Sequence, residues 1–326
     1  MGSSFSQGTP YSTLADDFRI LMIGGGTVGQ ALYRAIDERQ DFLAERTGRS
    51  WRFVRVVVRE ATRARGIPGD LLTADLDSAI SQPHDVLVEV AGGVEGPREW
   101  IRESLACGIP VVTANKALLA LHGDEIFGGA TPIRWEAAVA GGIPVIDTME
   151  RILSGNRITR IEGVLNGTTN FILNQMESGQ TYAEALIEAQ RLGYAEADPT
   201  SDVDGFDPLY KVSLLASLAV GYPVRPVATR QEGIRDFPVS RIQAAMAEGR
   251  RVRLVATADF DSESVTLTVE PREFDASHPF SQLSGPQNAI QVTGDLCGTV
   301  TLIGQGAGGD ATASSVLGDL MILAQS

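Results

Sequence analysis

Several acidic side chains and a lysine lie close together between Gly193 and Ala219, where the chain reads GYAEADPTSDVDGFDPLYKVSLLASLA. The acidic residues are Glu196, Asp198, Asp202, Asp204 and Asp207. Asp207-Pro208 before an apolar run is typical of a helix start, so a helix is predicted there with Asp207 as its N-cap. Asp207 and Lys211 are then i and i+4 on one face of a largely buried helix. A lysine buried in this way needs a partner or a role in proton transfer.

Lysine is nearly absent from the rest of the chain. Of the 27 Lys and Arg residues, only Lys116 and Lys211 are lysines. A coding bias toward Arg explains the scarcity, but the two lysines that remain are then informative. Arg stays protonated, whereas Lys can release a proton when its surroundings lower its pKa. We therefore expect at least one of the two lysines to be catalytic.

The acidic stretch could also bind a metal ion, because Asp202 to Gly205 (DVDG) resembles part of a calcium loop. In that alignment, the twelfth position, which requires a bidentate carboxylate, is Lys211, and this excludes an EF-hand. The carboxylates are then suited to holding a substrate ammonium group. Lys211, helped by Lys116, is suited to meeting the oxygen of a carbonyl that receives a hydride. Two neighbouring ammonium groups are expected to lower each other's pKa.

A site for a hydride carrier is predicted near the N-terminus. An apolar run from Phe18 leads into GGGTVG and then into helical periodicity. The strand, glycine turn and helix around G-x-G-x-x-G are typical of a dinucleotide site, although a glycine turn without a ligand is the alternative. The expected cofactor contacts here are Gly24, Gly25, Gly26, Thr27, Val28 and Gly29. Ala91 and Lys116 follow later strands and should lie at the same edge of the sheet.

The choice between NAD and NADP depends on the end of the second strand, which is predicted over residues 51–58. Arg59 and Glu60 stand there side by side. An acid would hold the ribose 2′-hydroxyl of NAD, and an arginine would favour the 2′-phosphate of NADP. Arg59 is nearer the strand, with Arg63 and Arg65 after it, so the pattern leans to NADP. A solvated surface charge is the alternative for Arg59.

The pattern of elements predicts an α/β protein with two parts. Strands over 85–90, 109–113 and 132–139 alternate with helices, which indicates a Rossmann-type, doubly wound parallel sheet. Beyond residue 145, β segments over 251–258, 264–270, 289–292 and 299–303 lack helices between them, which favours a mixed or antiparallel sheet. We expect a loose tail over 1–17, an NAD(P)-binding domain over 18–145 completed by a C-terminal helix over 306–326, and an α+β substrate and dimerisation domain over 146–305.

Composition narrows the class of partner. The net charge of −14 argues against nucleic acid, whose phosphates require a basic surface. No apolar run approaches the length of a membrane span, and the first residues lack the pattern of a signal peptide. We expect a cytoplasmic protein that acts on a small molecule.

The chain resembles homoserine dehydrogenase over nearly its whole length. The similar motifs are GGGTVG at 24–29, VVTANKALLA at 111–120, EAAVAGGIPVI at 136–146, NGTTNFIL at 166–173, GYAEADPTSDVDGFDPLYK at 193–211 and GAGGDATASSV at 306–316. The resemblance implies reversible NAD(P)H-dependent reduction of L-aspartate 4-semialdehyde to L-homoserine. A reductase of another small amino aldehyde or keto acid, or a cofactor-binding sensor without catalysis, are the alternatives. The intact lysines and acids argue against the sensor.

The resemblance also implies roles for individual residues. They are Lys211 as proton donor, Lys116 near nicotinamide and substrate, Glu196 and Asp207 on the substrate, Thr168 nearby and Gly308 against the cofactor. A monovalent cation, usually sodium, is expected at Glu136 and the backbone carbonyls of Val139, Gly141 and Ile143. The family implies a homodimer paired through the central β segments. We expect the short form, without an ACT-type regulatory domain or an aspartokinase domain.

Overall fold

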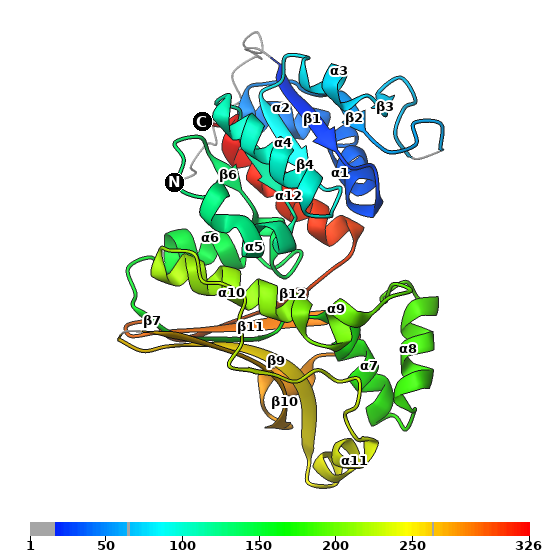
Figure 1. The fold of residues 1–326 in the computed structure, drawn as a ribbon, viewed down its shortest axis with the longest axis vertical. Coiled ribbons are helices and arrows are strands. Elements are labelled where there is room, and N and C mark those ends of the chain that lie inside the picture. The colour runs from blue at the N-terminus through cyan, green and yellow to red at the C-terminus, as the bar shows by residue number, and fades with distance from the viewer. Residues whose placement is uncertain (1–16, 64–65, 263) are drawn as a thin grey trace, which may run out of the picture.

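The computed structural model describes residues 17–63, 66–262 and 264–326. The expected tail therefore lies outside the described residues except for Asp17, as does Arg65. Figure 1 shows two lobes, one above the other, each built on its own sheet. Within the described ranges, every helix is too short or too polar to cross a membrane.

The upper lobe is built on a parallel sheet in the order β3-β2-β1-β4-β5-β6. Its strands are β1 (Phe18–Ile23), β2 (Trp51–Val57), β3 (Leu72–Thr73), β4 (Val86–Glu89), β5 (Val111–Thr113) and β6 (Ile133–Arg134). The central strands are almost continuously apolar and buried, as strands covered on both faces must be. The predicted doubly wound sheet is confirmed. The strand expected over 132–139 is wrong in its second half, because residues 136–138 form a 3₁₀ turn, η1 (Glu136–Ala138).

Helices pack on this sheet along the chain and again at its end. They are α1 (Thr27–Asp37), α2 (Gln40–Thr47), α3 (Leu76–Ile80), α4 (Glu95–Ala106), α5 (Lys116–Ile126) and α12 (Gly309–Ala324). Helix α12, red in Figure 1, packs against α1 and η1. The C-terminal residues therefore return to the upper lobe and bring the 306–308 loop with them.

The lower lobe is built on a mixed sheet in the order β12-β11-β7-β9-β10-β8. Its strands are β7 (Ile158–Val164), β8 (Arg230–Gln231), β9 (Arg250–Phe260), β10 (Val265–Asp275), β11 (Gln287–Gly294) and β12 (Gly298–Gln305). All pairs are antiparallel except β8 with β10. The predicted mixed sheet is confirmed, with β7 paired between β11 and β9.

The helices of the lower lobe place the acidic stretch between the two sheets. They are α6 (Val145–Asp147), the π-type turn η2 (Thr148–Ile152), α7 (Gly167–Glu177), α8 (Tyr182–Arg191), α9 (Thr200–Val203), α10 (Phe206–Val220), α11 (Val239–Ala247) and η3 (Pro279–Gln282). Helix α10 contacts β7, β9 and β10 on one side and α5 on the other (Figure 1). Most apolar residues in its middle are buried, including Val212, Leu214 and Leu215. Lys211 is therefore held on a helix fixed by packing from both lobes.

Candidate active site

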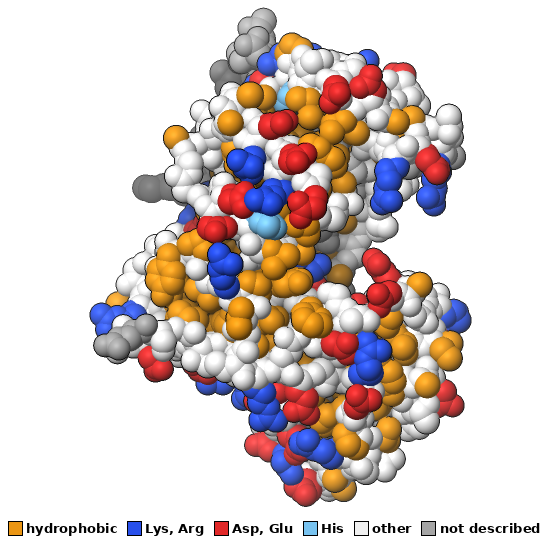
Figure 2. Space-filling model, in the orientation of Figure 1, with side chains coloured by type: hydrophobic (Ala, Val, Ile, Leu, Met, Phe, Trp, Pro, Cys, Tyr) orange, Lys and Arg blue, Asp and Glu red, His pale blue; other side chains and the backbone are white. Residues whose placement is uncertain are grey.

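A cavity of about 790 Å³ lies where the two lobes meet. Its walls come from the ends of β4 and β5, the turn after η1, the start of α7, the acidic stretch, α10 and the loop before α12. Figure 2 shows the molecule indented between the two lobes on the right of the view. The carboxyl ends of parallel strands are where ligands bind in such sheets, and the volume suits a small substrate with its cofactor.

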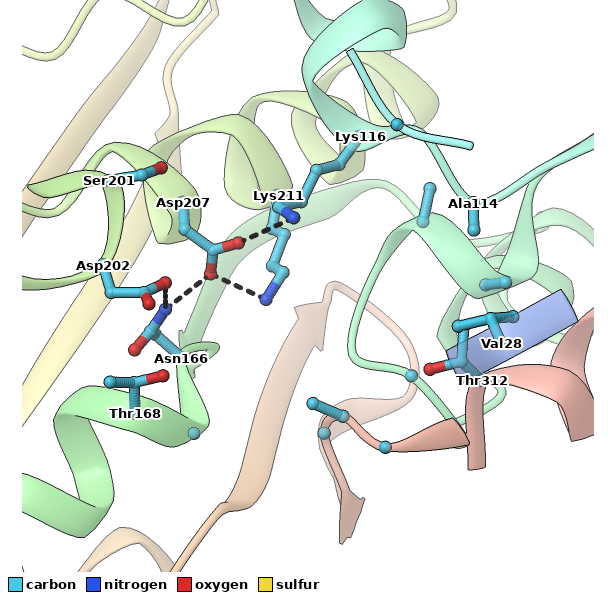
Figure 3. A pocket seen from close by; sticks show the side chains of 18 of the residues that line it. Val28, Ala114, Lys116, Asn166, Thr168, Ser201, Asp202, Asp207, Lys211 and Thr312 are labelled. Atoms are coloured by element: carbon cyan, nitrogen blue, oxygen red, sulfur yellow. Dashed lines mark hydrogen bonds and ion pairs between the residues drawn. The ribbon is translucent and has the colours of Figure 1, made fainter. Parts of the chain in front are cut away.

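The carboxylate of Asp207 lies at the centre of the charged groups in this cavity (Figure 3). Its Oδ2 accepts hydrogen bonds from Lys211 Nζ at 2.7 Å and from Asn166 Nδ2 at 2.8 Å. Its Oδ1 lies 3.1 Å from Lys116 Nζ. The two lysines of the chain therefore meet at one acid, although 95 positions separate them in the sequence (211 − 116).

The predicted N-cap role of Asp207 is wrong. Helix α10 begins at Phe206, and its N-cap is Gly205, whose φ of 86° is in the left-handed region that glycine tolerates. Asp207 is already inside the first turn, so its side chain is turned to the lysines instead of closing the helix. The predicted i, i+4 pairing with Lys211 is confirmed.

The charges at this site alter one another's proton affinity. Burial alone would raise the pKa of Asp207, but the Lys211 and Lys116 charges and the hydrogen bonds lower it below its usual value. The charge of Asp207 in turn raises the pKa of Lys116, against the opposing effect of burial. The expectation that the lysines lower each other's pKa is therefore wrong for Lys116, because a carboxylate lies between the two ammonium groups.

Lys211 is buried, with 8% of its surface exposed, as the apolar sequence around it predicts. Besides Asp207, its ammonium group donates to the carbonyl oxygen of Leu165, directly after β7, at 2.6 Å. An ammonium group has three N–H donors. Two are used in these hydrogen bonds, and the third is available toward the cavity that Lys211 lines.

Asn166 is a site residue that the sequence analysis missed. Its Nδ2 donates to Asp202 Oδ1 at 2.7 Å and to Asp207, which links the two acids (Figure 3). Its Oδ1 accepts from the backbone N–H of Thr169 and so caps α7. Asn directly before a helix is a usual cap signal, but the bridge to the acids has no local signal.

The remaining acidic residues of the stretch separate into two groups. Glu196, Asp198 and Asp202 line the cavity. Burial, followed by the charge of Asp207, raises the pKa of Asp202. Asp204 instead forms an ion pair with Arg235 at 2.8 Å, outside the cavity lining. Thr168 also lines the cavity and donates its hydroxyl to the carbonyl of Tyr194 at 2.6 Å.

The glycine turn has the geometry expected of a dinucleotide site. Gly24 has a φ of 117°, and a Cβ there would lie 2.6 Å from the carbonyl of Val90. A Cβ on Gly29 would lie 2.1 Å from the carbonyl oxygen of Gly24, so helix α1 can sit this close only with glycine. Gly26 faces open space and is the N-cap of α1. A pyrophosphate can therefore approach the backbone and the start of the helix.

Some of the other expected cofactor residues line the cavity, and Arg59 does not. Val28, Ala91, Lys116 and Gly308 line the cavity, together with Gly141 from the turn after η1. Gly25 and Thr27 belong to the same turn and helix start as Gly26. Arg59 follows β2 by two residues, is exposed and is not among the described residues that line the cavity.

The turn after η1 carries the expected cation ligands. Glu136 is 6% exposed, and its two carboxylate oxygens accept from the backbone N–H groups of Ile146 at 2.9 Å and Asp147 at 2.7 Å. Burial raises the pKa of Glu136 to about 7. Ala140, with φ 57°, and Gly141, with φ 56°, are both left-handed, which is strained for Ala140.

Among the described residues, no group of three or more His, Cys, Asp or Glu side chains is arranged to hold a metal ion. A cation beside Glu136 would therefore depend on backbone oxygens such as those of Val139, Gly141 and Ile143. The carbonyl of Gly141 already accepts from Ser315 Oγ at 2.6 Å, and a carbonyl oxygen can accept a second contact. A carboxylate and backbone carbonyl oxygens are the kind of ligands that a hard cation takes.

Comparison with known proteins gives consistent matches along the chain. Residues 144–321 match the family model described as "Homoserine dehydrogenase", and residues 24–132 match "Homoserine dehydrogenase, NAD binding domain". A homoserine dehydrogenase of Corynebacterium glutamicum is 40% identical, over 93% of this chain and 71% of the relative. That of Bacillus subtilis is 37% identical, over 93% and 72%.

Solved structures agree with these sequence matches. The crystal structure of a homoserine dehydrogenase from Thiobacillus denitrificans superposes with a TM-score of 0.89 at 36% identity, over 95% of this chain and 74% of that one. A hyperthermophilic archaeal homoserine dehydrogenase in complex with NADPH superposes with a TM-score of 0.77 at 28% identity, over 94% and 97%.

Proposed function

The chain belongs to the homoserine dehydrogenase family of NAD(P)-dependent oxidoreductases, and from this premise we propose its reaction, its site residues and its cofactor preference. The proposed reaction is the reversible reduction of L-aspartate 4-semialdehyde to L-homoserine. One observation carries the proposal: the Asp207 carboxylate holds both lysines of the chain at the end of the parallel sheet, beside the glycine turn.

Lys211 and Lys116 perform the acid and electrostatic work in this proposal. A bound NAD(P)H supplies the hydride. Lys211 directs its third N–H at the aldehyde oxygen and gives it a proton as the carbon is reduced. Lys116, half-exposed at the start of α5, stabilises the negative charge that develops on the same oxygen. In the direction of homoserine oxidation, the neutral amine of Lys211 accepts the hydroxyl proton.

Asp207 acts in this scheme by holding the two ammonium groups. Both of its oxygens are engaged by Lys211, Asn166 and Lys116, so its effect on the substrate passes through them. Glu196, which lines the cavity and is exposed, is proposed to hold the substrate ammonium group. Thr168 lines the same cavity and is proposed to lie near the substrate.

The proposed cofactor is NADP in preference to NAD. Gly24 to Gly29 would cradle the pyrophosphate, and Ala91 and Gly308, which line the cavity, would contact the dinucleotide. Arg59 is proposed to pair with the 2′-phosphate because it follows β2, the position that distinguishes the two cofactors in this fold.

A sodium ion is proposed at Glu136 and the carbonyls of Val139, Gly141 and Ile143. It would stabilise the strained turn that borders the cavity. Replacing sodium chloride with choline chloride should lower the thermal midpoint of the wild type and leave that of Glu136→Gln nearly unchanged. An equal fall of the thermal midpoint in the two proteins would refute a cation site at Glu136.

The domain division and the assembly are proposed on the family resemblance. The NAD(P)-binding domain would comprise residues 18–145 with 306–326, and the substrate and dimerisation domain residues 146–305. The homodimer would pair through the β segments of the lower lobe. Light scattering that gives the mass of a single chain at micromolar concentration would contradict it.

The decisive experiment is oxidation of L-homoserine by the purified protein with NADP⁺ and, separately, with NAD⁺. We expect homoserine-dependent formation of the reduced cofactor at 340 nm. Preferred turnover of another amino alcohol would overturn the substrate proposal. Cofactor binding with no turnover of any amino alcohol would indicate a sensor.

A further inference from the structure

Glu89 is a fully buried acid, with 0% of its surface exposed, that the proposed reaction does not use. It ends β4 and forms part of the cavity wall. Its Oε1 accepts hydrogen bonds from the backbone N–H groups of Ala91 at 2.9 Å and Gly92 at 3.1 Å. The carboxylate therefore folds the chain after β4 into the turn that faces the cavity.

The other oxygen of Glu89 reaches the neighbouring strand. Thr113, at the end of β5, donates its hydroxyl to Glu89 Oε2 at 2.7 Å, and the same hydroxyl oxygen accepts from the backbone N–H of Asn115 at 3.0 Å. Asn115 Nδ2 donates to the carbonyl of Gly93 at 2.8 Å. The hydrogen bonds thus form a closed ring through two strand ends and the 91–93 turn.

This ring contacts both the start of α5, which carries Lys116, and the segment on which the glycine turn packs. Asn115 is also the N-cap of α5, since its Oδ1 accepts from Leu118 N at 3.2 Å, and α5 begins at Lys116. On the other side, a Cβ on Gly24 would lie 2.7 Å from the backbone nitrogen of Ala91, so the glycine turn rests directly on this segment. A shift of the 91–93 turn would therefore disturb both.

We propose that Glu89 is a positioning residue, which acts through the Thr113–Asn115 ring to set the 91–93 turn for the dinucleotide and the start of α5 for Lys116. Burial raises the pKa of Glu89, and the hydrogen bonds from Thr113, Ala91 and Gly92 oppose that rise. An acid in this position is unfavourable for folding unless its donors are all in place. Its role rests on the proposed function only in taking the cavity as the dinucleotide site.

Purified variants should be tested for binding of NADP⁺ and NADPH by calorimetry, without substrate. Glu89→Gln keeps the shape but removes the charge. Thr113→Val removes the hydroxyl that joins the two strands, and Thr113→Ser keeps it. Thr257→Val, which alters a buried threonine of β9 in the lower sheet, is the matched control.

We expect Glu89→Gln and Thr113→Val to weaken cofactor binding by about tenfold or more, the scale of one hydrogen bond to a charged group. Thr113→Ser should restore affinity to within about threefold, and Thr257→Val should bind as the wild type does. Wild-type affinity in both Glu89→Gln and Thr113→Val would overturn the inference. If Glu89→Gln does not fold, the Thr113 pair decides.

A double-mutant cycle separates positioning from general loss of stability. Asn115→Ala should weaken cofactor binding less in the Glu89→Gln background than in the wild type, because both residues act on one turn. Additive effects would contradict the ring. Failure of the wild type to bind either cofactor would refute the proposed function itself, whereas wild-type binding without an effect of these variants would refute only the role of Glu89.

Discussion

Replacing Lys211 with methionine tests the proposed chemistry most directly. The change keeps an unbranched side chain of similar length in the buried helix but removes the ammonium group. Two hydrogen bonds are lost, to Asp207 at 2.7 Å and to the carbonyl of Leu165 at 2.6 Å. Asp207 keeps Lys116 at 3.1 Å and Asn166 at 2.8 Å, so its charge is still compensated.

The expected loss of stability follows from what remains unpaired. The Leu165 carbonyl loses the Lys211 donor, and a buried acceptor left in this way costs about 1–3 kcal/mol. We expect the free energy of unfolding in urea to fall by about that amount. The free energy of unfolding should fall by less than it does when a buried charge loses its partner, which typically costs about 3–5 kcal/mol.

The expected loss of activity is much larger. Removal of a general acid lowers turnover by about 10²–10⁴-fold, while cofactor affinity should stay within a few fold because the glycine turn is untouched. Lys211→Arg should also be inactive, since arginine does not release a proton near neutral pH. Turnover of Lys211→Met within about tenfold of the wild type, where the protein is folded, would refute Lys211 as the proton donor.

Three further predictions follow from other contacts. Asp207→Asn should destabilise the protein by about 3–5 kcal/mol in urea, more than Lys211→Met, because both ammonium groups lose their counter-charge; the reverse order would contradict the central place of Asp207. Arg59→Ala should raise KM for NADPH and leave KM for NADH unchanged. An equal rise of KM with both cofactors would refute the proposed contact of Arg59 with the 2′-phosphate. Arg253→Met should lower the free energy of unfolding by about 3–5 kcal/mol, because this buried arginine pairs with Glu177 and donates to several carbonyls. The exposed control, Arg157→Met, should change the free energy of unfolding by no more than about 0.5 kcal/mol.

The elements that the sequence predicts well are those specified by local patterns. Apolar runs interrupted by helical periodicity indicate the parallel sheet, and the spacing of Gly24, Gly26 and Gly29 indicates its first turn. The end of the strand predicted over 132–139 is not local. The backbone N–H of Glu136 donates to Asp319 on α12, and its carboxylate accepts from residues 146 and 147, so contacts from far along the chain turn the backbone there.

In the candidate site, too, some features follow from local sequence patterns and others from contacts between distant segments. The i, i+4 relation of Asp207 and Lys211 follows from helix geometry, and the rarity of lysine indicates which cations matter. That Lys116 reaches the same carboxylate depends on how α5 packs against α10, which no local pattern encodes. The sequence therefore predicts the members of the site, but the sign of the Lys116 pKa shift requires knowing what lies between the two lysines.

The place of Asn166 shows why identities alone do not determine this site. Buried Asp207 and partly buried Asp202 lie near one another and would repel if nothing joined them. A cation between them would relieve the repulsion but would compete with the lysines for Asp207. The Asn166 amide donates to both acids without adding charge, and it caps α7 with its oxygen. A neutral bridge of this kind keeps Asp207 available to both lysines, and only the assembled fold reveals that the asparagine between β7 and α7 provides it.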